Sequence, residues 1–207
     1  MASSLGVLAE QAAERLGAPL GPRASAAVRT WLERLQEWNA RIDLTAARSP
    51  EELVDLMLGD ALVLAPELPP GASLVDVGTG AGAPGLALAL LREDLRVTLC
   101  EPLGKRASFL RTVIGAVGRS DVAVERARGE SLARPGPGWD VAVSRATLAP
   151  PAWLELGASL VAPGGAVWAL LAKDAPPEHP RATLEADLAY AWPLTGAARR
   201  LIRYRMA

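Results

Sequence analysis

The stretch that decides the fold is Ser73-Leu74-Val75-Asp76-Val77-Gly78-Thr79-Gly80-Ala81-Gly82-Ala83-Pro84-Gly85. It begins as a short apolar run, which is typical of a buried strand, and becomes glycine-rich before the helix-like segment 84–91. Glycines permit positive φ angles and let a ligand approach the backbone closely. A strand, a glycine-rich loop and a helix in this order indicate a nucleotide-binding unit of the α/β class.

An acidic residue stands where such a unit needs one. Glu101 ends the next strand-like run, 96–101, about twenty residues after the glycine loop. A carboxylate at this place can accept hydrogen bonds from both ribose hydroxyls of a nucleoside. The loop and Glu101 together therefore predict a cofactor that contains a nucleoside.

The glycine spacing leaves two cofactor classes open. Gly80-x-Gly82-x-x-Gly85 matches a dinucleotide fingerprint, so an NAD-dependent oxidoreductase is one alternative. Asp76 argues against it, because a negative charge just before the first glycine favours a sulfonium over a pyrophosphate. Pro84 also argues against it, because a proline removes a backbone N–H that a pyrophosphate would use at the helix start. These residues favour S-adenosylmethionine as the cofactor.

Strand-like and helix-like segments alternate after the loop. The further strand-like runs are 121–125, 139–144 and 166–172, with the helix-like segment 105–117 among the connections. This alternation predicts a doubly wound, mostly parallel sheet with right-handed crossovers. Near the end, Trp192-Pro193-Leu194, the turn Thr195-Gly196-Ala197 and the run 200–206 predict a hairpin, so we expect the last strand to be antiparallel.

The N-terminal part has the periodicity of helices. Trp31 and Leu35 belong to an apolar stripe at helical spacing. A further helix is expected from Ser49-Pro50-Glu51-Glu52, which offers a cap, an N1 proline and first-turn acids. An apolar stripe must be buried, so we expect residues 1–70 to form a helical extension packed on a catalytic domain of residues 71–207.

Composition argues against several other classes of protein. The chain has 207 residues with 50% hydrophobic and 22% charged residues, as in a globular protein. A net charge of −1 argues against a protein whose main task is to coat nucleic acid. With Cys100 and His179 as the single cysteine and histidine, we expect neither a disulfide nor a metal site. No signal peptide or bilayer-spanning run is seen, so we expect a cytoplasmic protein.

Several segments resemble a known family. The loop 76–85, with its proline-glycine close, is similar to the cofactor loop of bacterial 16S (small-subunit) ribosomal RNA guanine-N7 methyltransferases, the glucose-inhibited division protein B family. The other matching segments are Trp38-Asn39, Asp43-Leu44-Thr45-Ala46, Leu103-Gly104-Lys105-Arg106, Phe109-Leu110, Ser144-Arg145-Ala146 and Arg199-Arg200-Leu201-Ile202. The resemblance covers nearly the whole chain from about Trp31 onward. It implies a seven-stranded, Rossmann-like, S-adenosylmethionine-dependent methyltransferase fold with an antiparallel last strand and an N-terminal helical extension.

The resemblance also implies cofactor contacts. By position, Gly78, Ala83, Gly129, Glu130 and Arg145 match the family's cofactor-contacting places. With the residues argued above, the expected cofactor site comprises Asp76, Gly78, Gly80, Gly82, Ala83, Glu101, Gly129, Glu130 and Arg145. Arg145 ends a strand-like run, where ligands bind in open α/β sheets, so we expect it to be catalytic and to contact the cofactor or the target guanine. A surface ion pair with a neighbouring acid is the alternative for Arg145.

The implied reaction is methyl transfer to N7 of a guanine in 16S ribosomal RNA, as free RNA or in the small ribosomal subunit. Guanine N7 carries no proton at neutral pH, so the reaction requires in-line positioning and no general base. The candidate RNA contacts are Lys105, Arg106, Arg199 and Arg200. For the arginine tail, a solvated strand edge is an equal alternative. We expect a monomer that needs no metal.

Two departures from the family leave the substrate open. The family has a His before Leu-Asp-Ser, whereas this chain has Met57-Leu58-Gly59-Asp60-Ala61, and Lys173 stands two residues later than the family's lysine. Both positions belong to the RNA side, so a diverged methyltransferase of a small molecule or of another RNA is an alternative. A non-catalytic binding protein that keeps the fold is another.

Overall fold

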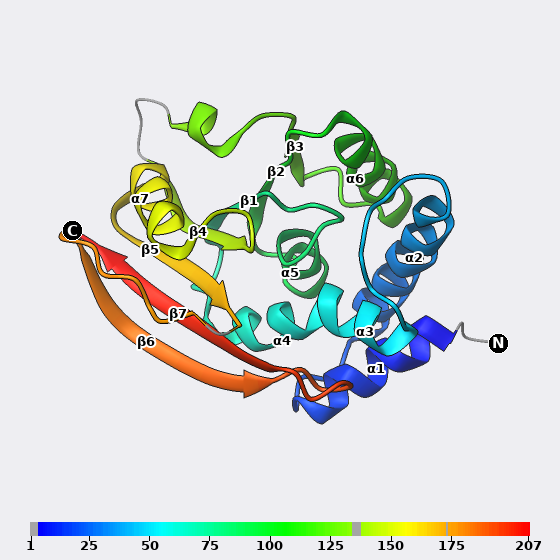
Figure 1. Cartoon of the computed structure of the whole chain (residues 1–207). Coiled ribbons are helices and arrows are strands. Elements are labelled where there is room, and N and C mark those ends of the chain that lie inside the picture. Colours follow the sequence, from blue (N-terminus) through cyan, green and yellow to red (C-terminus); the bar gives the residue numbers. More distant parts are fainter. Residues whose placement is uncertain (1–3, 134–137, 173) are drawn as a thin grey trace.

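The computed structural model describes residues 4–133, 138–172 and 174–207, and its centre is one seven-stranded sheet (Figure 1). The strands are β1 (Ser73–Val77), β2 (Arg96–Cys100), β3 (Ala123–Glu125), β4 (Trp139–Arg145), β5 (Val161–Leu171), β6 (Ala182–Ala191) and β7 (Ala198–Met206). Their order is β3-β2-β1-β4-β5-β7-β6, with β1 to β5 parallel and β7 antiparallel to both neighbours. The predicted fold class and the antiparallel last strand are confirmed.

The strand order places a ligand site beside β1. β1 pairs with β2 on one side and with β4 on the other, so the order of strands along the chain reverses at this point. Ligands of open α/β sheets bind outside the carboxyl ends of the strands at such a switch point. The glycine loop leaves β1 at this edge.

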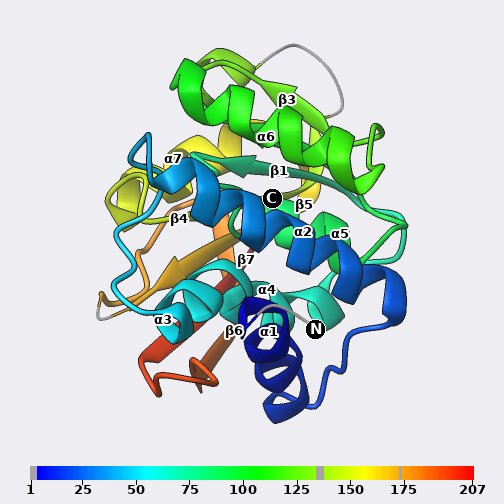
Figure 2. The ribbon, with the colours of Figure 1, turned by 90° about the vertical axis from the view of Figure 1, so that its right-hand side faces the viewer.

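Helices cover both faces of the sheet (Figures 1 and 2). The helices are α1 (Ser4–Arg15), α2 (Pro22–Asn39), α3 (Pro50–Val54), a π-helix (Asp55–Gly59), α4 (Asp60–Leu64), α5 (Gly85–Leu91), α6 (Gly104–Val117) and α7 (Pro150–Leu160), with 3-10 turns at Ala65–Glu67 and Gly129–Leu132. Apolar residues of α1 to α6 form one buried cluster with the sheet, and those of α7 form a second cluster with it. No helix of the described residues is long and apolar enough to span a bilayer.

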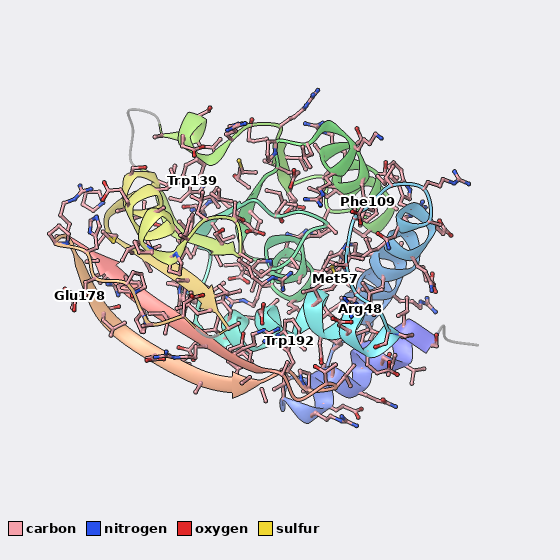
Figure 3. The ribbon with its side chains drawn as sticks, viewed as in Figure 1. Arg48, Met57, Phe109, Trp139, Glu178 and Trp192 are labelled. Atoms are coloured by element: carbon pink, nitrogen blue, oxygen red, sulfur yellow. The ribbon has the colours of Figure 1, made fainter. Side chains whose placement is uncertain are left out.

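The N-terminal helices share the core of the sheet. Trp31 and Leu35 of α2 are fully buried in the same cluster as Leu74 of β1. Trp38 at the end of α2 contacts Phe109 of α6, with ring centroids 5.6 Å apart. Phe109 is labelled in Figure 3. One core includes residues of both parts and marks no boundary at residue 70. The division into an extension of residues 1–70 and a domain of residues 71–207 therefore stays a prediction.

The C-terminal hairpin differs from the predicted one. Its first strand is β6, and the expected arm Trp192-Pro193-Leu194 belongs to the turn between β6 and β7. Trp192 closes this turn, since its N–H donates to the carbonyl of Ala197 and its carbonyl accepts the N–H of Gly196, both at 2.9 Å. β6 is an edge strand rich in alanine and acidic residues, which are depleted in strands. Its sequence therefore did not indicate a strand.

Candidate cofactor and target site

Glu101 holds the glycine loop from the end of β2. One carboxylate oxygen accepts the N–H of Gly80 at 3.0 Å, and the other accepts the N–H of Leu103 at 2.8 Å. The residue is 2% exposed. Each oxygen keeps a second acceptor site, which is compatible with the expected ribose contact. The loop-holding contact itself was not predicted from the sequence.

Trp31 holds the loop from the other side. Its indole Nε1–H donates to the carbonyl of Ala81 at 3.0 Å, although the two residues lie 50 positions apart. The ring also packs against Gly82, where an added Cβ would meet Trp31 at 3.1 Å and Leu86 at 2.9 Å. The N-terminal helix α2 therefore helps to shape the loop.

Asp76 is fully buried beneath the loop. Its Oδ2 accepts the N–H of Gly85 at 2.8 Å, whereas its Oδ1 has no hydrogen-bond partner in the part of the chain that the structure describes. The hydroxyl oxygen of Thr79 is buried and unpartnered in the same way. Burial raises the pKa of Asp76 to about 6, and the neighbouring Thr79 hydroxyl and the Gly85 N–H oppose this rise. Asp76 and Thr79 thus lie together beneath the loop, where the negative charge of Asp76 favours a cationic ligand in the loop hollow.

The raised pKa of Asp76 predicts a pH-dependent stability. Because the folded state has a pKa of about 6 against 3.8 for the unfolded chain, Asp76 contributes full stability below about pH 4. That contribution is lost as the pH rises through 6, and it amounts to about 3 kcal/mol. Asp76→Asn cannot ionise, so we expect it to lack this pH dependence. Urea denaturation of both proteins between pH 4 and 7.5 measures the effect, and parallel curves would refute it.

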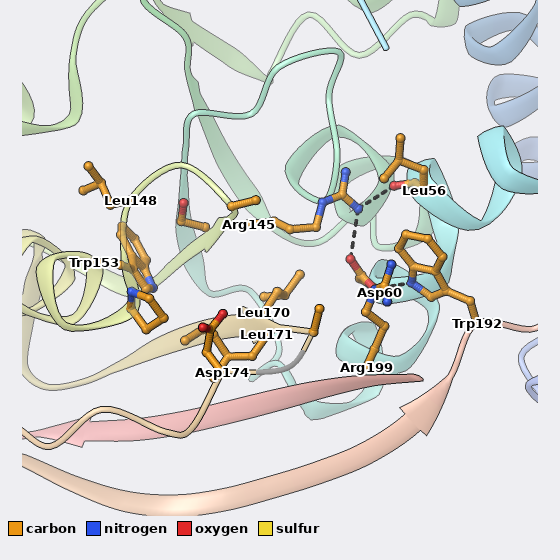
Figure 4. Close-up of a pocket in the computed structure, with 15 residues that line it drawn as sticks. Leu56, Asp60, Arg145, Leu148, Trp153, Leu170, Leu171, Asp174, Trp192 and Arg199 are labelled. Carbon is orange, nitrogen blue, oxygen red and sulfur yellow. Dashed lines mark hydrogen bonds and ion pairs between the residues drawn. The ribbon is translucent and has the colours of Figure 1, made fainter. Parts of the chain in front are cut away.

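Three adjoining hollows open at the carboxyl edge of the sheet. The β2 hollow, of about 230 Å³, is lined by Val77, Gly78, Cys100, Pro102, Leu103, Arg128, Gly129, Glu130, Thr147, Leu148 and Leu156. The loop hollow, of about 260 Å³, is lined by Asp43, Leu44, Thr45, Ala46, Leu56, Met57, Gly78, Thr79, Gly80, Ala81, Ala83, Arg106 and Arg145. The β5 hollow, of about 250 Å³, is lined by Leu56, Asp60, Ser144, Arg145, Ala146, Leu148, Pro150, Trp153, 169–172, Asp174, Trp192 and Arg199 (Figure 4). Shared lining residues make the three hollows one continuous surface.

Most of the expected cofactor residues meet at this surface. Gly78 lines both the β2 hollow and the loop hollow, and Arg145 lines both the loop hollow and the β5 hollow. Of the others, Gly129 and Glu130 line the β2 hollow, and Gly80 and Ala83 line the loop hollow. Gly82, Asp76 and Glu101 line none of the three: Gly82 faces α2, and the side chains of Asp76 and Glu101 are buried behind the lining.

Arg145 is held by a buried acid. Its Nη1 donates to the carbonyl of Leu56 and forms an ion pair with Oδ2 of Asp60 at 2.9 Å (Figure 4). Asp60 is 1% exposed, and its Oδ1 accepts Tyr190 Oη–H and Trp192 Nε1–H, each at 2.6 Å. The ion pair named as the alternative for Arg145 thus exists, but it is buried rather than at the surface. Burial and the carboxylate of Asp60 raise the pKa of Tyr190 far above its usual range, so this hydroxyl remains a donor.

The segment that departs from the family pattern carries this acid. The single helix expected from Ser49 is instead α3, a π-helix and α4, and π-helical turns often occur at functional sites. Asp55 in the π-helix accepts the N–H of Thr195 at 2.7 Å and its hydroxyl at 2.7 Å, which fastens the hairpin turn. A Cβ on Gly59 would lie 2.8 Å from Cδ1 of Trp192, so glycine is what lets the indole reach Asp60. An acid inside an apolar helical stretch was the signal that could have indicated Asp60.

The candidate RNA contacts fall into two groups. Arg106 lines the loop hollow, Arg199 stacks on Trp192 with its guanidinium carbon 3.6 Å from the ring centroid, and Lys105 is exposed. None of these three takes part in an ion pair between described residues. Arg200 instead pairs with Asp187 of β6.

The rest of the arginine tail is also paired, with one glutamate shared between two arginines. Arg203 and Arg205 both pair with Glu185, at 3.1 and 3.0 Å. The alternative of a solvated strand edge is wrong for this tail, because β7 lies between β5 and β6 and the edge strand is β6.

The other chemistry-bearing residues have structural surroundings. Cys100 donates its thiol to the carbonyl of Ala127 at 3.2 Å, and burial raises the pKa of this thiol to about 12. No group of three His, Cys, Asp or Glu residues able to hold a metal occurs in residues 4–133, 138–172 and 174–207. Lys173 lies outside the described residues.

The fold and this surface define the class of S-adenosylmethionine-dependent methyltransferases. In fold, the chain is similar to an O-methyltransferase from Bacillus cereus solved with SAH, at 20% identity and a TM-score of 0.59, over 86% of this chain and 91% of that one. It is also similar to a SAM-dependent methyltransferase from Aquifex aeolicus, at 14% identity and a TM-score of 0.56, over 85% and 98% of the two chains.

The sequence places the chain within that class. It belongs to the GidB family, rRNA small subunit methyltransferase G, whose model matches residues 24–191. The ribosomal RNA small subunit methyltransferase G of Anaeromyxobacter dehalogenans strain 2CP-1 is 38% identical over 205 residues, which is 93% of each chain. The protein of the same name from Halorhodospira halophila is 45% identical over 141 residues, 68% of this chain and 66% of that one. The resemblance seen in the sequence is thereby confirmed.

Proposed function

We propose that this protein transfers the methyl group of S-adenosylmethionine to N7 of a guanine in 16S ribosomal RNA. The observation that carries the proposal is the continuous surface of three hollows at the carboxyl edge, with Arg145 lining two of them. Membership of the rRNA small subunit methyltransferase G family supplies the class of substrate. A ribosomal substrate places the enzyme in the cytoplasm, and we propose that it acts as a monomer.

The residues of the β2 and loop hollows fit the parts of the cofactor. S-adenosylmethionine supplies an electrophilic methyl group on a sulfonium centre. Glu101 would accept hydrogen bonds from the ribose hydroxyls, and the apolar walls from Leu103 and Leu156 would enclose the adenine. The backbone at Gly80 would bind the amino-acid end, and the buried charge of Asp76 beneath the loop would favour the cationic ligand.

The target base would enter from the β5 hollow. Arg145 uses Nη1 for Leu56 and Asp60, so its remaining N–H groups can face the substrate. Guanine N7 must keep its lone pair free for the methyl group, so Arg145 would donate to O6 or a phosphate and not to N7. The chemistry needs no proton acceptor, and the chain has to position the base and exclude water.

The RNA contact is local, because the whole chain has a net charge of −1. Arg106 and Arg199 lie on the loop hollow and the β5 hollow, so both would face RNA that enters the site. Lys105 next to Arg106 would extend this contact. Arg200 is neutralised by Asp187 and would contribute less.

A methyl-transfer assay on unmodified small ribosomal subunits tests the function. We expect incorporation of label from S-adenosylmethionine into 16S ribosomal RNA, with the modified base mapped to a guanine N7. Free 16S ribosomal RNA, assayed in parallel, identifies the form of the substrate. Absence of label in both, from a protein that binds the cofactor, would favour a small-molecule or different RNA substrate.

We expect Glu101→Gln to weaken binding of both S-adenosylmethionine and S-adenosylhomocysteine. The change removes a charged acceptor for the ribose and for Gly80, so a loss of roughly 1.5–3 kcal/mol is expected in calorimetric titration. Glu125→Gln is the matched control, because Glu125 is exposed at the end of the neighbouring strand β3. Equal affinities for Glu101→Gln and the control would exclude the ribose role.

A further inference from the structure

We propose that Asp60 is a charge-compensating positioning residue, which holds Arg145 in place and cancels its charge beside the sulfonium site. This inference rests on the proposed function, because it requires a sulfonium ligand in the loop hollow. It concerns a residue in the segment where the chain departs from its family pattern.

Asp60 cannot itself serve the substrate. Its Oδ2 is paired with Arg145 at 2.9 Å, and its Oδ1 accepts two donors, from Tyr190 and Trp192, each at 2.6 Å. With 1% of its surface exposed, it is enclosed by these groups. Although Asp60 lines the β5 hollow, its oxygens are thus committed to groups of the protein, and we expect it to act on the reaction through Arg145.

Arg145 needs a compensating charge at this place. It lines the loop hollow, where the sulfonium would lie, and its side chain is only 17% exposed, so water screens its charge weakly. A bare guanidinium there would repel the sulfonium. Methylation at N7 also leaves a positive charge on the guanine, which a bare guanidinium in the β5 hollow would oppose. The ion pair of Arg145 with Asp60 has no net charge as a whole, while Arg145 keeps N–H groups that can donate to the substrate.

Apart from Asp60 and Arg145, the loop hollow and the β5 hollow are each lined by one acidic and one basic residue. Asp43 and Arg106 line the loop hollow, and Asp174 and Arg199 line the β5 hollow. Without Asp60, Arg145 would therefore be an excess cation among the residues that line these hollows, with Asp76, buried beneath the loop, as a further acid that interacts electrostatically with it.

The C-terminal hairpin completes the arrangement. Tyr190 lies one residue before the end of β6 and Trp192 begins the turn, and both reach Asp60, 130 and 132 positions away in the sequence. Trp192 packs against Gly59. The guanidinium of Arg199 lies over the indole ring of Trp192 (Figure 4). The hairpin therefore holds the carboxylate of Asp60 in place, and this carboxylate holds the guanidinium of Arg145.

Comparison of two ligands tests the charge role. S-adenosylmethionine and S-adenosylhomocysteine share every polar group, but only the first carries the sulfonium charge. In calorimetric titrations of the full chain, we expect Asp60→Asn to lower the affinity for S-adenosylmethionine on the order of tenfold more than that for S-adenosylhomocysteine. Asp94→Asn is the matched control, since Asp94 pairs with Arg92 at 2.8 Å just before β2, at the opposite edge of the sheet. It should leave the affinity ratio unchanged.

Two further variants keep the test decisive. Arg145→Gln alone should shift the ratio of the two affinities toward S-adenosylmethionine, because it leaves Asp60 as an uncompensated anion. This variant tests the charge role even if Asp60→Asn does not fold. Asp60→Asn combined with Arg145→Gln should return the ratio to within about twofold of the wild type. Equal losses for both ligands in the folded single variants would overturn the charge role. A wild-type protein that binds neither ligand would instead refute the proposed function.

Discussion

Trp31→Ala is expected to lower the free energy of unfolding by about 3–5 kcal/mol, the range found for truncation of a buried large aromatic side chain. Trp31 has 0% exposure in the main core cluster, so its removal leaves a cavity between α2 and the glycine loop. The change also leaves the carbonyl of Ala81 without its donor. Affinity for S-adenosylhomocysteine should therefore fall together with stability.

Two controls separate these effects. Trp31→Phe keeps a six-membered ring but removes the Nε1–H donor and part of the indole volume, so a smaller loss of about 1–3 kcal/mol is expected. Trp139→Ala changes a partly exposed tryptophan at the start of β4, and should be the mildest of the three. Urea unfolding midpoints measure the order of the three losses of stability, provided that the slope of the unfolding free energy against urea concentration is the same for each protein. A Trp31→Ala protein with the wild-type midpoint would show that the N-terminal helices are not part of the sheet's cooperative unit.

The sheet and the cofactor loop could be predicted because their signals are local. β1 is an apolar run of five residues buried from Leu74 to Val77, and the glycines follow it directly. Glu101 could be placed because the βαβ unit brings the end of β2 beside the end of β1. In each case the residues that interact are close in the chain or fixed by strand order.

The support of Arg145 could not be predicted because it depends on distant pairings. Asp60 meets Tyr190 and Trp192 only after the hairpin has packed against the π-helix, more than 120 residues away in sequence. Helical periodicity does not distinguish a π-helical turn from an α-helix, so the exposed and buried positions of 55–59 could not be assigned.

The charges of the arginine tail depend on register in the same way. Arg200 faces Ala189 in the ladder and still reaches Asp187, two residues along β6. A sequence in which β6 is unrecognised cannot show that this arginine is neutralised. Recognition of β6 and its turn is also needed to see that Arg199 stacks on Trp192, whereas Arg200 pairs with Asp187.

Gly85→Ala is expected to lower the free energy of unfolding by about 2–5 kcal/mol, through overpacking and a lost hydrogen bond to a carboxylate. A Cβ on Gly85 would lie 2.6 Å from Cβ of Asp76 and 2.6 Å from Cδ2 of Leu99, so α5 would have to move away from the sheet. That movement would stretch the 2.8 Å bond from its N–H to Asp76.

Gly80→Ala is the informative comparison, because Gly80 lies in the same loop for a different reason. Its φ of +59° disfavours a side chain, by about 1–2 kcal/mol, but the nearest atom to an added Cβ is 4.0 Å away. The new methyl group would enter the loop hollow, so affinity for S-adenosylhomocysteine should fall by roughly tenfold or more, while the loss of stability should not exceed this backbone cost. Gly85→Ala should show the opposite balance, with stability lost first. If both variants lost stability equally and affinity equally, Gly80 and Gly85 would both serve only the backbone of the turn, and the space at Gly80 would not belong to the ligand.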